Sequence, residues 1–175
     1  MIRNILGAIG LLSVLTGASA AVFFFGGYFN VAATATEPRL MRWALIQVRE
    51  ASVQRHAHEQ PTVGLTSPDV ILTGARAYLE RGCVSCHGAP GVVWHKFSEG
   101  LRPDPPDLAN ISKSRTPEQL YFVIKNGINM TGMPSFGSST EQELWAMVAF
   151  VKQLPSVSAE QFKSWTGPGA TVSRS

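Results

Sequence analysis

The chain has 175 residues, which fits one domain with additional segments or at most two small domains. Charged residues make up only 15% of it and the mean hydropathy is slightly positive, so part of the chain should contact lipid or be deeply buried. The formal net charge is only +3 and the sequence contains no run of lysines and arginines, which argues against a nucleic-acid-binding protein.

The first segment, residues 1–36, contains an uncharged stretch from Ile5 to Phe29. This stretch is longer than the ~20 residues that span a bilayer, whereas the apolar region of a cleavable signal has about 7–15. We therefore predict an uncleaved transmembrane anchor, although residues 18–20 or 33–35 could serve as a small-x-small cleavage site. Arg3 predicts an N-terminus on the inside. Both interpretations place the rest of the chain in an exported compartment.

The second segment, residues 37–66, is predicted to be a connecting helix and a linker. Residues 39–55 contain no glycine or proline and carry four arginines against one acidic residue, Glu50. This helix is either a solvated element packed on the next domain or a basic amphipathic helix that contacts anionic headgroups or a partner subunit. We expect His56 and His58, which follow it in a polar stretch, to be exposed rather than bound to a metal.

Residues 67–166 are predicted to be one helical domain, with a flexible tail over residues 167–175. N-cap residues, first-turn prolines and apolar spacing predict helices over residues 69–81, 117–126 and 144–154. We expect only a short last turn over residues 156–162. Gly74 and Tyr78 share one face of the first helix, and the missing side chain at Gly74 predicts the close approach of another helix.

Residues 83–87 have the pattern C-x-x-C-H, which is typical of a c-type haem attachment. Cys83 and Cys86 would each form a thioether bond, and His87 would bind the iron as the proximal ligand. A disulfide would close a small, strained loop. Two other interpretations remain, a thioredoxin-like redox pair and a structural zinc site with ligands from elsewhere, for which His56 and His58 are the candidates.

A loop over residues 128–137 offers the second axial ligand. A thioether sulfur is an adequate donor to haem iron, and a loop lets it reach the opposite face. Pro134 stiffens the backbone beside Met133, which we therefore prefer over Met130, the alternative ligand. His95 lies too close to the proximal motif to cross the haem.

Two further residues have predicted roles near a haem. We interpret Trp94 as part of the haem wall or of the core. Arg102 lies in a proline-rich, extended segment over residues 100–108 that can line a haem edge. It is either a surface residue or the partner of a haem propionate.

Residues 67–155 resemble a class I monohaem cytochrome c. The resemblance is carried by the motif at 83–87, the Met-Pro loop and the apolar helix at 144–150; residues 27–33 and 84–91 are similar to membrane-anchored bacterial cytochromes. It implies an all-α fold, the class I cytochrome c fold around one covalent haem c, in which the first and last helices cross. It also implies attachment through Cys83 and Cys86, with His87 and Met133 as axial ligands.

We therefore expect a single-pass protein of the inner (cytoplasmic) membrane with its haem domain in the periplasm. It would carry single electrons and would not be an enzyme by itself. Its partner would be a redox protein or the subunits of a respiratory or dehydrogenase complex. Residues 69–175 contain ten basic and nine acidic residues, and such weak charge steering suits a tethered protein. The alternatives are an enzyme or gas sensor with an open iron site, which requires that Met133 does not bind, and a structural subunit with a vestigial haem.

Overall fold

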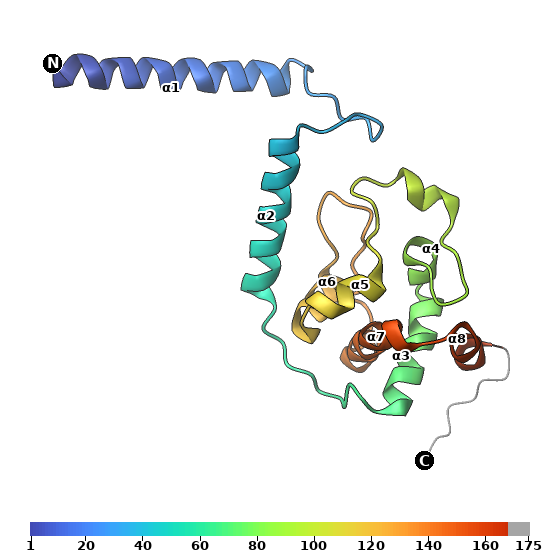
Figure 1. The fold of residues 1–175 in the computed structure, drawn as a ribbon. Helices are drawn as coiled ribbons and strands as arrows, with labels where there is room; N and C mark the ends of the chain where they lie inside the picture. Colours follow the sequence, from blue (N-terminus) through green and yellow to red (C-terminus); the bar gives the residue numbers. More distant parts are fainter. Residues whose placement is uncertain (168–175) are drawn as a thin grey trace. The chain divides into compact units, whose positions relative to one another are not determined.

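The computed structural model describes residues 1–167, which contain helices and loops but no β-strand. The all-α prediction is therefore confirmed. The chain divides into two compact units, Met1–Glu37 and Pro38–Ser175 (Figure 1). The predicted tail, residues 167–175, lies outside the described residues apart from Gly167.

The first unit consists of one long helix, α1 (Ile2–Phe25), and the turn that follows it. None of its residues is buried, and it is long and apolar enough to cross a membrane. At about 1.5 Å per residue its length is ~36 Å, against ~30 Å for the hydrocarbon core of a bilayer. Phe24 packs against Phe23 and Phe29 at ring-centroid distances of 5.3 and 5.5 Å, which forms an aromatic cluster at the C-terminal end.

The second unit contains seven α-helices and two 3₁₀ helices within the described residues. The α-helices are α2 (Arg39–His56), α3 (Pro68–Glu80), α4 (Cys83–His87), α5 (Leu108–Ser114), α6 (Pro117–Asn126), α7 (Glu141–Gln153) and α8 (Ala159–Thr166), and the 3₁₀ helices are η1 (Lys96–Gly100) and η2 (Leu154–Ser156).

The core of this unit is the crossing of α3 and α7. Every residue of α7 from Leu144 to Val151 is buried. A Cβ atom on Gly74 would lie 1.9 Å from the backbone oxygen of Ala146, so only glycine permits this approach. One turn later, the ring of Tyr78 lies 5.2 Å from that of Phe150. The predicted contact of the Gly74 face with the last apolar helix is confirmed.

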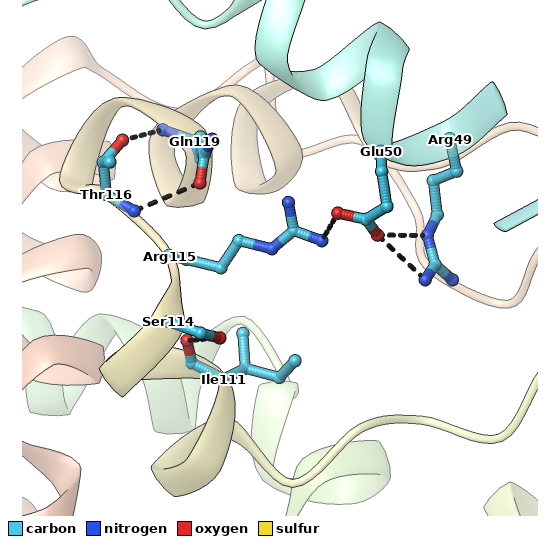
Figure 2. A network of polar contacts seen from close by, with 7 residues as sticks. All are labelled: Arg49, Glu50, Ile111, Ser114, Arg115, Thr116 and Gln119. Atoms are coloured by element: carbon cyan, nitrogen blue, oxygen red, sulfur yellow. Dashed lines mark hydrogen bonds and ion pairs between the residues drawn. The ribbon is translucent and has the colours of Figure 1, made fainter. Parts of the chain in front are cut away.

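Helices α6 and α7 begin directly after the capping residues that the sequence contains. At α6, the Thr116 hydroxyl accepts the backbone N–H of Gln119, and the Gln119 side chain accepts the backbone N–H of Thr116, as Figure 2 shows. At α7, the hydroxyl of Thr140 accepts the N–H of Glu143 without the reciprocal bond. These contacts fix where each helix begins.

The prediction of a short turn over residues 156–162 was wrong, because α8 is a full helix. Ser158 starts it in a capping box, and Phe162 is buried with its ring 5.7 Å from that of Phe150. The helix is too short to give a periodic apolar stripe. Its capping box was the available signal.

Helix α2 packs on the other helices of the second unit through its own C-terminal half. Val53 is buried, and the ring of His56, itself exposed as predicted, stacks on Phe122 at 6.0 Å. The carboxylate of Glu50 forms ion pairs with Arg49 and with Arg115, which precedes α6 (Figure 2). The second interaction joins α2 to the rest of the unit across a distance of 65 positions in the sequence (50 to 115).

The stability that the ion pairs of Glu50 give to the packing of α2 should depend on pH. Burial alone would raise the pKa of Glu50, but the hydrogen bonds and charges of Arg115 and Arg49 outweigh it, so the pKa lies below its ordinary value of 4.5. A carboxylate whose pKa is lowered by folding stabilises the folded state at pH values above its unfolded-state pKa. This contribution is lost as the pH falls through the folded-state pKa.

We expect Glu50→Gln to loosen α2 at neutral pH by about 1 kcal/mol, which is roughly a fivefold faster amide exchange. In the wild type, the same loosening should develop only below pH 4.5. Hydrogen exchange resolved to α2 measures both effects. Glu99→Gln, at an exposed site on η1, is the control and should leave α2 unchanged. Equal exchange in α2 of both variants would contradict this account.

Candidate functional site

The C-x-x-C-H motif forms one short helix, α4, between two glycines. Gly82 at its start has φ 76° and Gly88 at its end has φ 65°, both in the region that favours glycine. Cys83 and Cys86 are free and half-buried, three positions apart, which places them on one side of the helix. The hydroxyl of Tyr78 donates to the Gly88 oxygen at 2.7 Å, so α3 holds the end of the motif.

The imidazole of His87 is oriented by the backbone. Its Nδ1 lies 3.0 Å from the carbonyl oxygen of Pro106. A carbonyl can only accept, so Nδ1 carries the proton and Nε2 keeps its lone pair for a metal. Burial lowers the pKa of His87, while the bond to Pro106 opposes the shift. The ring is therefore neutral at pH 7, as a metal ligand must be.

Neither alternative interpretation of the cysteines finds support. Burial raises the pKa of the Cys83 thiol to about 11, and the nearby Cys86 adds to the shift. A thioredoxin-like centre needs a lowered pKa, because the thiolate is the reacting form. A structural zinc site needs four ligands. Within residues 1–167, no group of three or more His, Cys, Asp or Glu side chains comes together, so His56 and His58 do not complete such a site.

The loop between α6 and α7 holds Met133 through its backbone. The carbonyl oxygen of Met133 accepts the N–H of Ile128 at 3.2 Å, and its N–H donates to the hydroxyl of Thr131 at 3.1 Å. Gly127, at φ 69°, leaves room for this fold, since a Cβ there would lie 2.7 Å from the Met133 oxygen. Met133 is half-buried. The side chain of Met130, by contrast, is 93% exposed.

A short strap, residues 101–107, contacts both candidate ligand segments. Near its start, the side chain of Leu101 lies against Gly132, where a Cβ would come within 2.9 Å. Near its end, Pro106 accepts the His87 hydrogen bond. In Figure 1 this segment, which leads into α5, runs beside the loop between α6 and α7. The strap therefore ties the Met133 loop and the His87 ring to one piece of backbone.

A family model described as "Cytochrome C oxidase, cbb3-type, subunit III" matches residues 69–151, from α3 through α7. The chain carries a monohaem class I c-type cytochrome domain. No match was found among curated proteins or among solved structures. The cytochrome therefore binds one covalent haem c, and Cys83 and Cys86 fit its attachment motif. Two free thiols on one helical turn and a neutral imidazole with an available nitrogen fit this group.

Three other predicted residues of the cytochrome lie in the segments around the motif. The backbone N–H of His95 donates to the Ser85 oxygen at 2.9 Å, which keeps this residue beside α4. The side chain of Trp94 is 49% exposed, so its assignment to the core was wrong and its place in the haem wall stays a prediction. Arg102 is exposed and forms an ion pair with Asp104, within the strap.

Sequence reasoning missed the residues that orient the ligands. Pro106 and Thr131 act through a carbonyl oxygen and a hydroxyl, and Leu101 acts by contact with Gly132. The proline-rich composition did predict an extended segment here. Which carbonyl in it would accept a bond from His87 depends on tertiary packing, for which the residue types give no signal.

Proposed function

We propose that this cytochrome carries single electrons between redox partners as a membrane-anchored protein, with His87 and Met133 as the axial ligands. The observation that supports this most directly is the strap, which connects a preset imidazole and a preset methionine loop. When bound, haem c supplies reversible one-electron chemistry at its iron. The residues around it hold two ligands in place.

Fixed ligands are what an electron carrier requires, because rearrangement between oxidation states slows transfer. The hydrogen bond from His87 to Pro106 sets the plane and the tautomer of the imidazole. On the other side, the bonds from Ile128 and to Thr131 restrain the Met133 backbone before any bond to iron is made. A weak thioether ligand then needs little additional ordering to bind.

The N-terminal segment supports a location at the inner membrane with the haem domain on the periplasmic side. Helix α1 has the length and composition of a membrane span, and Arg3 is its only charge. By the positive-inside rule, the N-terminus faces the cytoplasm and the cytochrome domain the other side. The matched family is described as an oxidase subunit, which supports a role in a membrane redox complex.

Purification of the full chain from detergent-solubilised membranes tests this proposal. We expect a low-spin haem in both oxidation states, reversible reduction and reoxidation by a co-purifying complex, and protease access to residues 38–167 from the periplasmic side only. A high-spin spectrum with rapid binding of carbon monoxide would instead favour the open-iron alternative, an enzyme or gas sensor. A haem that no membrane partner reduces or oxidises would favour a structural subunit.

A further inference from the structure

The C-terminal end of α6 is completed by the loop that departs from it. The last carbonyl groups of an α-helix have no partner within the helix and need donors from elsewhere. The backbone N–H of Phe136 donates to the Ile124 oxygen at 3.1 Å, and the hydroxyl of Ser135 donates to the Lys125 oxygen at 2.7 Å. The returning limb of the loop between α6 and α7 is therefore fastened to the helix end where that loop begins.

The hydroxyl of Ser135 makes two hydrogen bonds at this point. Besides donating to Lys125, its oxygen accepts the backbone N–H of Gly137 at 3.1 Å. The limb lies close to the helix end, since a Cβ on Gly137 would come within 3.2 Å of the Lys125 oxygen and 3.3 Å of the Ser135 Oγ. A residue without a hydroxyl at position 135 could make neither bond, so one side chain joins α6 to the returning limb.

Ser135 lies only two residues after Met133. Pro134 stands between them, and its ring restricts the backbone dihedral φ. Little slack therefore separates the residue that carries the thioether from the point where the limb is fastened. The bonds from Ile128 and to Thr131 restrain Met133 from the other limb of the loop. Together these contacts hold the Met133 backbone from both sides.

We propose that Ser135 is a positioning residue that keeps Met133 at the haem iron. A thioether is a weak ligand, so its bond depends on how much of the ordering of its loop is already present before it binds. Without the Ser135 hydroxyl, the loop would open more often, and a competing ligand could take the place of Met133. The inference rests on the proposed ligation by Met133 and adds a residue that stabilises it.

Titration of the oxidised, detergent-solubilised full-length cytochrome with imidazole tests the inference. Imidazole must displace Met133, so its apparent affinity rises with the fraction of open loop. Because the bond of Ser135 is exposed and its contribution modest, we expect Ser135→Ala to raise this affinity about threefold. Ser135→Thr retains the hydroxyl and should restore the wild-type affinity. Ser164→Ala is the matched control, since it removes an exposed hydroxyl that donates to the Gln161 oxygen at 2.8 Å on α8.

A double variant separates positioning of the ligand from a general structural role. In a Met133→Ala background there is no thioether left to position, so adding Ser135→Ala should leave the imidazole affinity unchanged. Two residues that act through one interaction are non-additive in this way, whereas independent effects add. A purely structural role of Ser135 would change the affinity by the same factor in both backgrounds.

Three results would overturn the inference while leaving Met133 as a ligand. Ser135→Ala with the wild-type affinity shows that the hydroxyl does not hold the loop. Ser135→Thr with the affinity of Ser135→Ala shows that the hydroxyl is not the cause. An equal increase in the Met133→Ala background shows that Ser135 acts independently of the thioether. A Met133→Ala protein that binds imidazole like the wild type would instead overturn the proposed ligation itself.

Discussion

Replacing Met133 by alanine is expected to abolish the long-wavelength absorption that reports an iron–sulfur bond in the oxidised cytochrome. The haem should become high-spin, bind carbon monoxide rapidly and lose potential on the order of 0.1 V, because axial ligands set haem potentials over a range of ~0.8 V. The physical reason is the loss of a thioether that favours the reduced iron. Visible spectroscopy combined with a redox titration measures all of these changes.

Met130→Ala is the matched control, since it removes an identical side chain from the same loop. The side chain of Met130 is almost fully exposed. We expect a spectrum and a potential like those of the wild type. If Met130→Ala gave the high-spin species and Met133→Ala did not, the ligand assignment would be reversed. A low-spin spectrum in both variants would rule out methionine ligation.

A single added methyl group at Gly74 should strongly destabilise the domain. Glycine in a helix is about 1 kcal/mol less favourable than alanine, so Gly74→Ala would ordinarily stabilise α3. Here the new Cβ would lie 1.9 Å from the Ala146 oxygen and 3.0 Å from the Phe150 Cβ, and α7 would have to move. We expect the free energy of unfolding to fall by about 2–3 kcal/mol.

Guanidinium denaturation of the detergent-solubilised cytochrome, followed by haem absorbance, measures this change in stability. Gly64→Ala is a suitable control, because a Cβ there would be 3.7 Å from Ser67, an ordinary contact. That variant should match the wild type or be slightly more stable. A Gly74→Ala protein as stable as the Gly64→Ala protein would show that the crossing of α3 and α7 is looser than described.

The elements that the sequence predicted well are those with a strong local signal. The capping residue Thr116 and the apolar spacing after it placed α6, and the uncharged stretch placed α1. Helix α5 was not predicted, because the prolines before it indicated an extended segment over residues 100–108. The N-cap residue of this helix, Asp107, was therefore overlooked; its side chain accepts the N–H of Ala109 at 2.8 Å. A short helix that depends on one cap leaves little periodicity to detect.

In the candidate site, too, the sequence predicted the residues with a strong local pattern and missed the others. Covalent attachment needs two cysteines and a histidine at fixed spacing, so residues 83–87 were readable directly. The contacts of the strap could not be predicted, because they involve a backbone oxygen and an aliphatic side chain from segments distant in sequence. The hydrogen bond between His87 and Pro106 spans 19 positions and depends on how the chain returns.

The crossing of α3 and α7 has a consequence for the order of events during biosynthesis. Gly74 and Ala146 are in contact, but Ala146 is synthesised 59 residues after the end of the motif at 83–87. Until α7 has emerged, the face of α3 that Gly74 leaves open has no partner, and the thiols of Cys83 and Cys86 belong to an unclosed chain. The two thiols, which are half-buried in the folded domain, are therefore expected to be most accessible for haem attachment before α7 packs on α3.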